Sequence, residues 1–221
     1  MMKVLDLFSG LGGWSKAFQD RGHEVITVDN ENRFNPTVCC DIMYLTAKEL
    51  IEGYGEFDVV LASPPCNCFS VASIGHHWKY NIPDVESLKA IELVKHTLNL
   101  IIDIRPKYWF LENPRAMLRT IIGNPPVTVF YAQYGEDRLK PTDIWGRHPR
   151  EFKDMQIADK ALLDYTKAPR GSRKGTQGIN RTDERARVPY KLSETVCKLC
   201  ETEHKKYNKN RKNDRGENTG L

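Results

Sequence analysis

Short apolar runs alternate along the chain with segments in which apolar residues recur at helical spacing. The runs that predict β-strands cover residues 3–7, 24–28, 57–62, 108–111 and 127–132. Helices are predicted at 14–21, at 85–104, at 117–122 and after Pro189, and Pro106 ends the second of them. This alternation favours an α/β fold, with a mostly parallel central sheet and helices on both faces.

Length and composition indicate one main domain. With 221 residues, 40% of them hydrophobic and 28% charged, the chain can build one sizeable core. We expect a single domain over residues 1–203, in which 147–180 forms a weakly patterned region rich in Arg, Lys, Gly and Ser. From 204 to 221, six basic residues stand against two acidic ones, which predicts a basic, disordered tail. Such a tail could attract phosphates or could simply aid solubility.

The cysteines and the apolar runs predict a cytoplasmic protein. No run approaches the roughly 20 apolar residues of a membrane-spanning helix, and no secretory signal precedes the first strand. Six cysteines in a chain of this length fit free thiols in a reducing compartment. Cys197 and Cys200, with His204, could form half of a zinc site, but no second pair lies at finger-like spacing, so no metal is predicted. We expect a monomer without membrane contact.

Polar or chain-breaking clusters follow four of the predicted strands. A glycine-rich turn from Ser9 to Gly13 follows the first strand, and Asp29 follows the second. The run Ser63-Pro64-Pro65-Cys66 and the run Glu112-Asn113-Pro114 follow two others. Parallel sheets bind ligands beyond the carboxyl ends of their strands, where glycines admit a ligand to the backbone and a carboxylate can accept ribose hydroxyls. A tight turn without a ligand is the alternative for the glycines.

Cys66 is the candidate nucleophile. It follows two prolines, so its backbone is stiff and extended at a strand end where a cleft is expected. A buried cysteine that acts as a small hydrophobe is the alternative interpretation. The carboxylate of Glu112 at another strand end favours the nucleophile, because a thiol and an acid at neighbouring strand ends suit covalent catalysis.

Together these motifs resemble the cytosine-5 DNA methyltransferase family. The family's first cofactor motif is similar to Asp6-Leu7-Phe8-Ser9-Gly10-Leu11-Gly12-Gly13. Its nucleophile loop is similar to Pro64-Pro65-Cys66 with Phe69-Ser70, and its acid motif is similar to Glu112-Asn113-Pro114. Asp41-Ile42 resembles the segment that contacts the adenine ring, and the likeness covers roughly residues 1–146. It implies a Rossmann-like, S-adenosylmethionine-dependent fold and methyl transfer to cytosine in double-stranded DNA.

The resemblance also implies a covalent mechanism. Cys66 adds to C6 of a flipped-out cytosine, while Glu112, protonated or sharing a proton, binds N3. C5 then accepts the methyl group, S-adenosylhomocysteine is left, and the loop from Asn67 to Tyr80 closes over the base. The residues implied to bind the cofactor are Phe8, Ser9, Gly10, Leu11, Gly12, Gly13, Trp14, Asp29, Asn30, Asp41, Ile42, Ser63, Pro64 and Ser193. The residues implied to contact the substrate are Pro65, Ser70, Asn113, Pro114 and Arg115.

The chain departs from the family pattern in three places. Asn67-Cys68 replaces the glutamine that usually follows the nucleophile, and Cys68 adds a second thiol. The family's Tyr-Gly…Gln-x-Arg-x-Arg motif is incomplete here, which leaves Arg138 or Lys140 as candidates for contact with the base. Only 147–180 is available for target recognition, so we expect short or relaxed sequence specificity. The run Glu184 to Ser193 resembles the compact ending of small, often phage-encoded relatives, as expected for a prokaryotic or virus-encoded protein.

Two other functions remain open from the sequence. The first is the same chemistry on transfer RNA, because a branch that modifies transfer RNA shares these motifs. The second is a catalytically silent protein that binds nucleic acid. Retention of both Cys66 and Glu112 argues against the silent protein, because binding alone requires neither residue.

Overall fold

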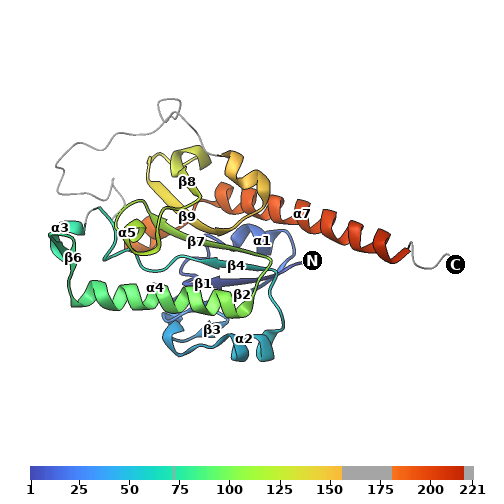
Figure 1. Cartoon of the computed structure of the whole chain (residues 1–221), viewed down its shortest axis with the longest axis horizontal. Coiled ribbons are helices and arrows are strands. Elements are labelled where there is room, and N and C mark those ends of the chain that lie inside the picture. The colour runs from blue at the N-terminus through green and yellow to red at the C-terminus, as the bar shows by residue number, and fades with distance from the viewer. Residues whose placement is uncertain (72, 156–180, 217–221) are drawn as a thin grey trace.

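A seven-stranded sheet forms the centre of the molecule (Figure 1). The computed structural model describes residues 1–71, 73–155 and 181–216. The sheet order is β3-β2-β1-β4-β7-β9-β8. The strands are β1 (Lys3–Leu7), β2 (Glu24–Asp29), β3 (Val38–Cys39), β4 (Val59–Ala62), β7 (Tyr108–Pro114), β8 (Val127–Phe130) and β9 (Pro141–Arg147). The first five in sheet order are parallel and the last two are antiparallel to their neighbours. The prediction of a mostly parallel sheet is confirmed.

Helices cover both faces of the sheet, as predicted. One face packs against α2 (Ala47–Tyr54), α4 (Val85–Ile104) and α5 (Leu118–Ile122), and the other against α1 (Lys16–Asp20) and α7 (Tyr190–Gly216). Strand alternation produces the two cores: Leu5 lies in the first core and Val4 in the second, both fully buried. Burial of one such side chain stabilises the fold by about 1.5–3 kcal/mol.

The residues at the two ends of helix α4 determine where it begins and ends. Its N-cap is Asp84, whose carboxylate accepts the Ser87 N–H at 2.8 Å. Its C-cap is Arg105 at φ 54°, directly before Pro106, which cannot continue a helix. The predicted bounds, 85–104, are confirmed.

The loop between β4 and α4 has structure of its own. It contains a short helix, α3 (Ile74–His77), and a hairpin of β5 (Trp78–Lys79) and β6 (Ile82–Pro83). Tyr80 and Asn81 form the hairpin turn, both at positive φ (54° and 64°). Four 3-10 helices, Asn32–Phe34, Ile42–Tyr44, Tyr131–Tyr134 and Arg150–Met155, and one short helix, α6 (Thr182–Ala186), complete the described elements.

Near the edge of the sheet, one strand prediction needs correction and one strand was missed. The predicted strand 127–132 ends at Phe130, because the Gln133 side chain accepts the Phe130 N–H at 2.7 Å and starts a 3-10 turn. Strand β9 was not predicted: its sequence includes Pro141 and Gly146, which weaken a strand pattern. Gly146, at φ 145°, lies so close to the Trp109 carbonyl that a Cβ would meet it at 1.9 Å.

The basic tail is the largest correction. Helix α7 continues to Gly216, so the expected disorder from His204 onward is wrong for residues 204–216, and 217–221 lie outside the described residues. The segment contains four lysines and two arginines, which favour a helix. Lys206 pairs with Glu151 at 3.2 Å, and Lys107 lies 4.4 Å above the Tyr207 ring. Of the helices in the described ranges, none has the length and apolar character needed to cross a membrane.

Candidate active site

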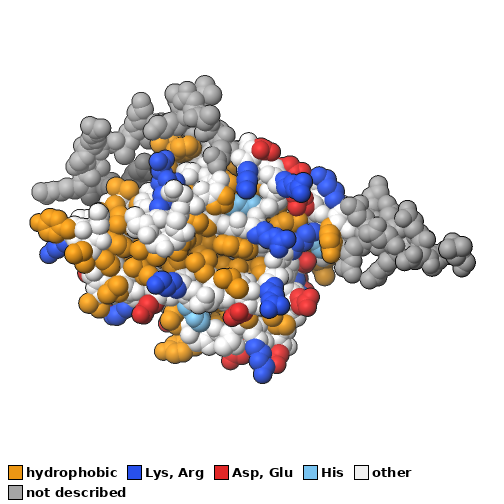
Figure 2. Space-filling view, in the orientation of Figure 1, with side chains coloured by type: hydrophobic (Ala, Val, Ile, Leu, Met, Phe, Trp, Pro, Cys, Tyr) orange, Lys and Arg blue, Asp and Glu red, His pale blue; other side chains and the backbone are white. Residues whose placement is uncertain are grey.

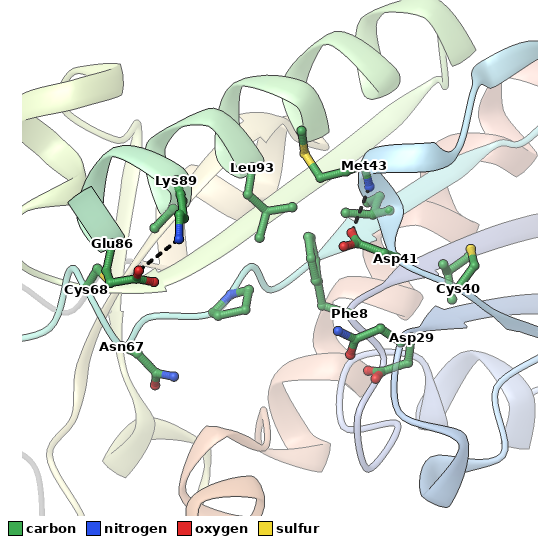
Figure 3. Close-up of a pocket in the computed structure, with 15 residues that line it drawn as sticks. Phe8, Asp29, Cys40, Asp41, Met43, Asn67, Cys68, Glu86, Lys89 and Leu93 are labelled. Atoms are coloured by element: carbon green, nitrogen blue, oxygen red, sulfur yellow. Dashed lines mark hydrogen bonds and ion pairs between the residues drawn. The ribbon is translucent and has the colours of Figure 1, made fainter.

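A cavity of about 330 Å³ lies at the carboxyl ends of β1, β2 and β4 (Figure 3). Phe8 follows β1, Pro65 follows β4, and Leu93 reaches the cavity from α4. In Figure 3 the side chains of Phe8, Asp41 and Leu93 point into it. Five of the residues predicted to bind the cofactor line this cavity: Phe8, Asp29, Asn30, Asp41 and Ile42. The combination of apolar walls and a few polar groups is typical of a small-molecule pocket.

Asp29 joins the glycine loop to the second strand. One carboxylate oxygen accepts the Gly10 N–H at 2.8 Å, and the other accepts the Glu31 N–H at 2.9 Å. Phe8 and Gly10 have left-handed φ values of 61° and 47°, which turn the loop sharply away from β1. Asp29 thus fixes the shape of the loop and also lines the cavity.

Gly13 lets the C-terminal segment approach this loop. A Cβ there would lie 2.7 Å from the Val188 nitrogen and 2.8 Å from its carbonyl oxygen. Only a residue without a side chain fits such a contact with backbone atoms. The start of α7 is therefore tied to the same loop that borders the cavity.

The acid and the nucleophile follow two adjacent parallel strands. Ala62 of β4 pairs with Leu111 of β7, so Glu112 and Cys66 leave the same edge of the sheet. Phe69 and Ser70 donate their N–H groups to the Cys66 carbonyl at 3.0 and 2.9 Å, which forms a compact turn after the cysteine. The structure thus places both predicted residues at this edge, with the Glu112 carboxylate near enough for its charge to raise the pKa of the Cys66 thiol.

Two hydrogen bonds fix the acid relative to the nucleophile loop. The Asn113 side-chain N–H donates to the Pro64 carbonyl at 2.9 Å, which joins β7 to the loop after β4. The buried Tyr131 hydroxyl donates to Glu112 Oε1 at 3.0 Å. Glu112 itself is 4% exposed. The carboxyl group therefore has little freedom to turn away from the site.

The environment of Cys66 opposes its ionisation. Burial raises the pKa of the thiol, and the nearby Glu112 carboxylate raises it further. Lys140 and then Arg185 act in the opposite direction and lower the same pKa. The residue as a whole is half-buried.

Lys140 and Arg138, the two basic candidates, occupy different places. Lys140 Nζ donates to the Arg185 carbonyl at 3.1 Å and lies 4.2 Å from the centre of the Tyr131 ring. Burial lowers the pKa of Lys140, and Glu112 and Cys66 both raise it, so this ammonium lies with the acid and the thiol. Arg138 instead lines a separate polar pocket and donates to Glu136 at 2.8 Å.

Some predicted residues support the site from behind. Trp14 is 2% exposed in the core beneath α7, and the Ser193 hydroxyl donates to its carbonyl. These contacts place Trp14 and Ser193 behind the glycine loop rather than along the cavity. The remaining predicted residues lie in or directly beside the two motifs, with Pro114 as the last residue of β7: Ser9, Leu11, Gly12, Ser63, Pro64, Ser70, Pro114 and Arg115. Of these, Arg115 donates its N–H to the Pro141 carbonyl at 3.0 Å.

The second cysteine of the nucleophile loop borders the cavity. Cys68 lines it, and the Trp78 indole N–H donates to the Cys68 carbonyl at 2.6 Å. The β5–β6 hairpin is therefore joined to the nucleophile loop. Figure 2 shows hydrophobic side chains gathered at the end of the molecule that carries this hairpin, where Tyr80 is 96% exposed.

Sequence patterns did not identify two buried polar residues near the site. Tyr131 packs under Lys140 and binds Glu112, but its sequence position resembles a strand residue. Asp6 is buried and accepts the Ser15 hydroxyl at 2.5 Å, and burial raises its pKa to about 7. Only the alternation of β1, which points Asp6 toward Ser15 at the start of α1, could have suggested this contact.

The cysteines of α7 lie away from the site. His23, Cys197 and Glu201 bring three possible ligand atoms within 4.8 Å of one another. Arg21 already binds both oxygens of Glu201, at 3.0 and 2.6 Å, and places a positive charge there. Burial raises the pKa of the Cys197 thiol to about 12, which disfavours a metal-binding thiolate.

Comparison with known proteins gives a consistent set of matches. Residues 2–124, more than half of the chain, match the family model described as C-5 cytosine-specific DNA methylase. A probable DNA (cytosine-5)-methyltransferase of Frog virus 3 is 32% identical over 154 residues, which are 65% of this chain and 70% of that protein. Type II methyltransferase M.XorII of Xanthomonas oryzae pv. oryzae is 31% identical over 128 residues, which are 51% of this chain and 28% of that protein.

The chain is thus much shorter than some of its relatives and spans less than a third of the length of M.XorII. Among solved structures, the Entamoeba histolytica methyltransferase EhMeth is similar with a TM-score of 0.48 and 17% identity. That similarity covers 76% of this chain and 58% of the other.

Proposed function

Because this chain belongs to the C-5 cytosine-specific DNA methylase family, we propose that it transfers a methyl group from S-adenosylmethionine to carbon 5 of cytosine in double-stranded DNA. One observation carries the proposal: Cys66 and Glu112 lie together at the ends of β4 and β7, beside a cavity of small-molecule size. A binding protein would need neither group in that position.

The cavity suits S-adenosylmethionine. It has an aromatic ring at Phe8 and apolar walls at Ile42 and Leu93 for a purine, and the carboxylate of Asp29 for hydroxyl groups. The loop from Ser9 to Gly13 offers backbone at close range. When bound, S-adenosylmethionine supplies an electrophilic methyl group carried on a positively charged sulfur.

The residues of this chain account for the rest of the chemistry. The Cys66 thiolate adds to C6 of cytosine, and Glu112 holds N3 and stabilises the negative charge that spreads onto the ring. That addition makes C5 nucleophilic. After transfer, loss of the C5 proton and expulsion of Cys66 restore the aromatic ring. Because C6 is shielded in a duplex, the cytosine has to leave the stack to reach Cys66.

Target recognition falls mainly outside the described residues. The predicted recognition region is 147–180, and the structure describes it only to Met155. We propose that the chain acts as a monomer with short sequence specificity, because few side chains are available in so short a segment to reach base edges.

The decisive experiment offers DNA and RNA side by side. The protein is incubated with S-adenosylmethionine bearing a deuterated methyl group and with duplex DNA or transfer RNA. The nucleic acid is then digested, and the nucleosides are separated and identified by mass spectrometry. We expect deuterated 5-methylcytosine from the DNA only. A labelled product from RNA alone would contradict the proposed substrate, and an unlabelled pool from both would contradict the enzyme assignment.

A further inference from the structure

A second pocket, of about 360 Å³, lies between the glycine loop and the segment before α7. Its lining is charged: three guanidinium groups and two carboxylates surround it, with one apolar residue. The lining residues are Leu11, Glu136, Arg138, Arg181, Glu184 and Arg187. The lining thus has one excess positive charge, whereas the cavity beside Phe8 is largely apolar.

Arg138 provides an independent sign that a ligand is missing from this pocket. Its side chain is buried, with 5% exposure, and one terminal nitrogen donates to Glu136 at 2.8 Å. Its Nε has no hydrogen-bond partner among the residues that the structure describes. A buried guanidinium donor without an acceptor is costly, and an anion in the pocket would satisfy it.

The pocket adjoins the proposed catalytic site. Arg187 packs against Gly13, where a Cβ would meet the Arg187 side chain at 2.7 Å, and Leu11 belongs to the same glycine loop. The carbonyl of Arg185, two residues earlier, accepts a hydrogen bond from Lys140 at 3.1 Å. A ligand here would lie next to the residues that surround Cys66.

We propose that this pocket binds a backbone phosphate of the nucleic acid that carries the target cytosine. The inference rests on the proposed function and adds a specific contact to it. Guanidinium groups bind phosphate oxygens through paired N–H donors, and such contacts fix the position of a duplex without reading its sequence. Arg181 also pairs with Asp183 and Glu184, at 2.7 and 3.5 Å, so the rim of the pocket is held in place.

The test measures duplex affinity as a function of salt. Binding of a fluorescent cytosine-containing duplex is followed by anisotropy for the unsubstituted protein, Arg187→Gln and Arg187→Lys. Loss of one phosphate contact changes the slope of log affinity against log salt by about 0.9. The affinity deficit of Arg187→Gln should therefore shrink about 3.5-fold when salt rises fourfold, since each contact contributes that slope. Arg187→Lys, which keeps the charge, should retain the original slope.

Arg105→Gln is the matched control. Arg105 is exposed like Arg187, and its substitution by glutamine also removes one positive charge. It lies before β7, at the amino ends of the parallel strands, and so at the opposite edge of the sheet from the pocket. For Arg105→Gln we expect the slope of log affinity against log salt to equal that of the unsubstituted protein. An unchanged slope for Arg187→Gln would overturn the phosphate site. So would a variant that binds duplex normally but loses S-adenosylmethionine in calorimetry, because the pocket would then hold the cofactor's carboxylate.

Methyl transfer to the same duplex separates this inference from the proposed function. If the unsubstituted protein methylates the duplex and Arg187→Gln binds it with unchanged slope, only the phosphate site is wrong. If the unsubstituted protein neither binds nor methylates it, the proposed function and the phosphate site both fail. Thermal unfolding of each variant establishes that a loss of binding is not a loss of fold.

Discussion

In the proposed mechanism, the thiol of Cys66 ionises in surroundings that oppose ionisation. Burial and the Glu112 carboxylate raise its pKa, and Lys140 partly compensates. The thiolate is the nucleophilic form, so the rate of methyl transfer should increase as the pH rises from neutral into the alkaline range. We propose that Lys140 is a positioning residue that acts by lowering the pKa of this thiol.

Lys140→Met tests that relation. Removal of the cation raises the pKa of Cys66 further, so the rising limb of the rate against pH should move to higher pH. At a pH below the pKa of Cys66, an increase of one in that pKa lowers the fraction of thiolate about tenfold. The pH dependence of single-turnover transfer is the measurement. A limb that stays in place while the rate falls equally at every pH would contradict this role.

The two neighbouring thiols allow a direct comparison. Cys66→Ser should lower transfer by at least about a thousandfold, because a hydroxyl ionises much less readily than a thiol and is the weaker nucleophile. Binding of S-adenosylmethionine should survive, since Cys66 does not line the cavity beside Phe8. Cys68→Ser should keep most of the activity. Transfer by both variants is measured in the deuterium assay. If Cys68→Ser were inactive and Cys66→Ser were active, the assignment of the nucleophile would be reversed.

At the scale of elements, the contact between the glycine loop and the start of α7 is the tightest constraint. Gly13→Ala would force a methyl group against the backbone of Val188, so we expect a loss of about 1–3 kcal/mol in the free energy of unfolding. Affinity for S-adenosylmethionine should fall as well, because the loop borders the cavity. Denaturant unfolding and calorimetry measure the two effects.

Gly53→Ala is the control for that substitution. Gly53 lies inside α2, and a Cβ there would meet no atom within 4 Å. Alanine should stabilise the helix by about 0.5–1 kcal/mol. If Gly13→Ala were as stable as Gly53→Ala, the close approach of the C-terminal segment would be wrong.

Most elements were predictable because their signals are local. The bounds of α4 follow from its apolar spacing, its Asp84 cap and Pro106, and β1 and β2 follow from short apolar runs. Strand β9 depends instead on pairing with β7 across the chain, and its own proline and glycine hide it. The extension of α7 was missed because charge was taken as a sign of disorder.

The candidate site divides in the same way. Cys66, Glu112 and the glycine loop could be predicted because each directly follows a strand in a motif of fixed spacing. The positions of Lys140 and Tyr131 could not, since their proximity to Glu112 arises from packing of the antiparallel edge. The charged pocket at Arg138 combines three separate segments and has no signature in any one of them.

For the whole molecule, the extended α7 changes how the basic tail should be tested. Lys206 and Tyr207 contact the domain, so a deletion that begins at 204 would also remove packing. Deletion of 209–221 instead removes four bases and two acids. The affinity of the shortened protein for duplex DNA should be lower than that of the full chain at low salt and equal to it at high salt. Its unfolding temperature should stay unchanged. Equal affinity at low salt would leave the tail without a role in binding.

The way α7 closes over α1 has a consequence for biosynthesis. Ser193 binds the carbonyl of Trp14, Glu201 binds Arg21, and the last helix covers apolar residues of the first strand. The ribosome makes the glycine loop well before it makes α7, the helix that supports that loop. A nascent chain should therefore gain affinity for S-adenosylmethionine only when the final helix has emerged, and pulse-labelled ribosome complexes of increasing length would show that affinity appearing in one late step.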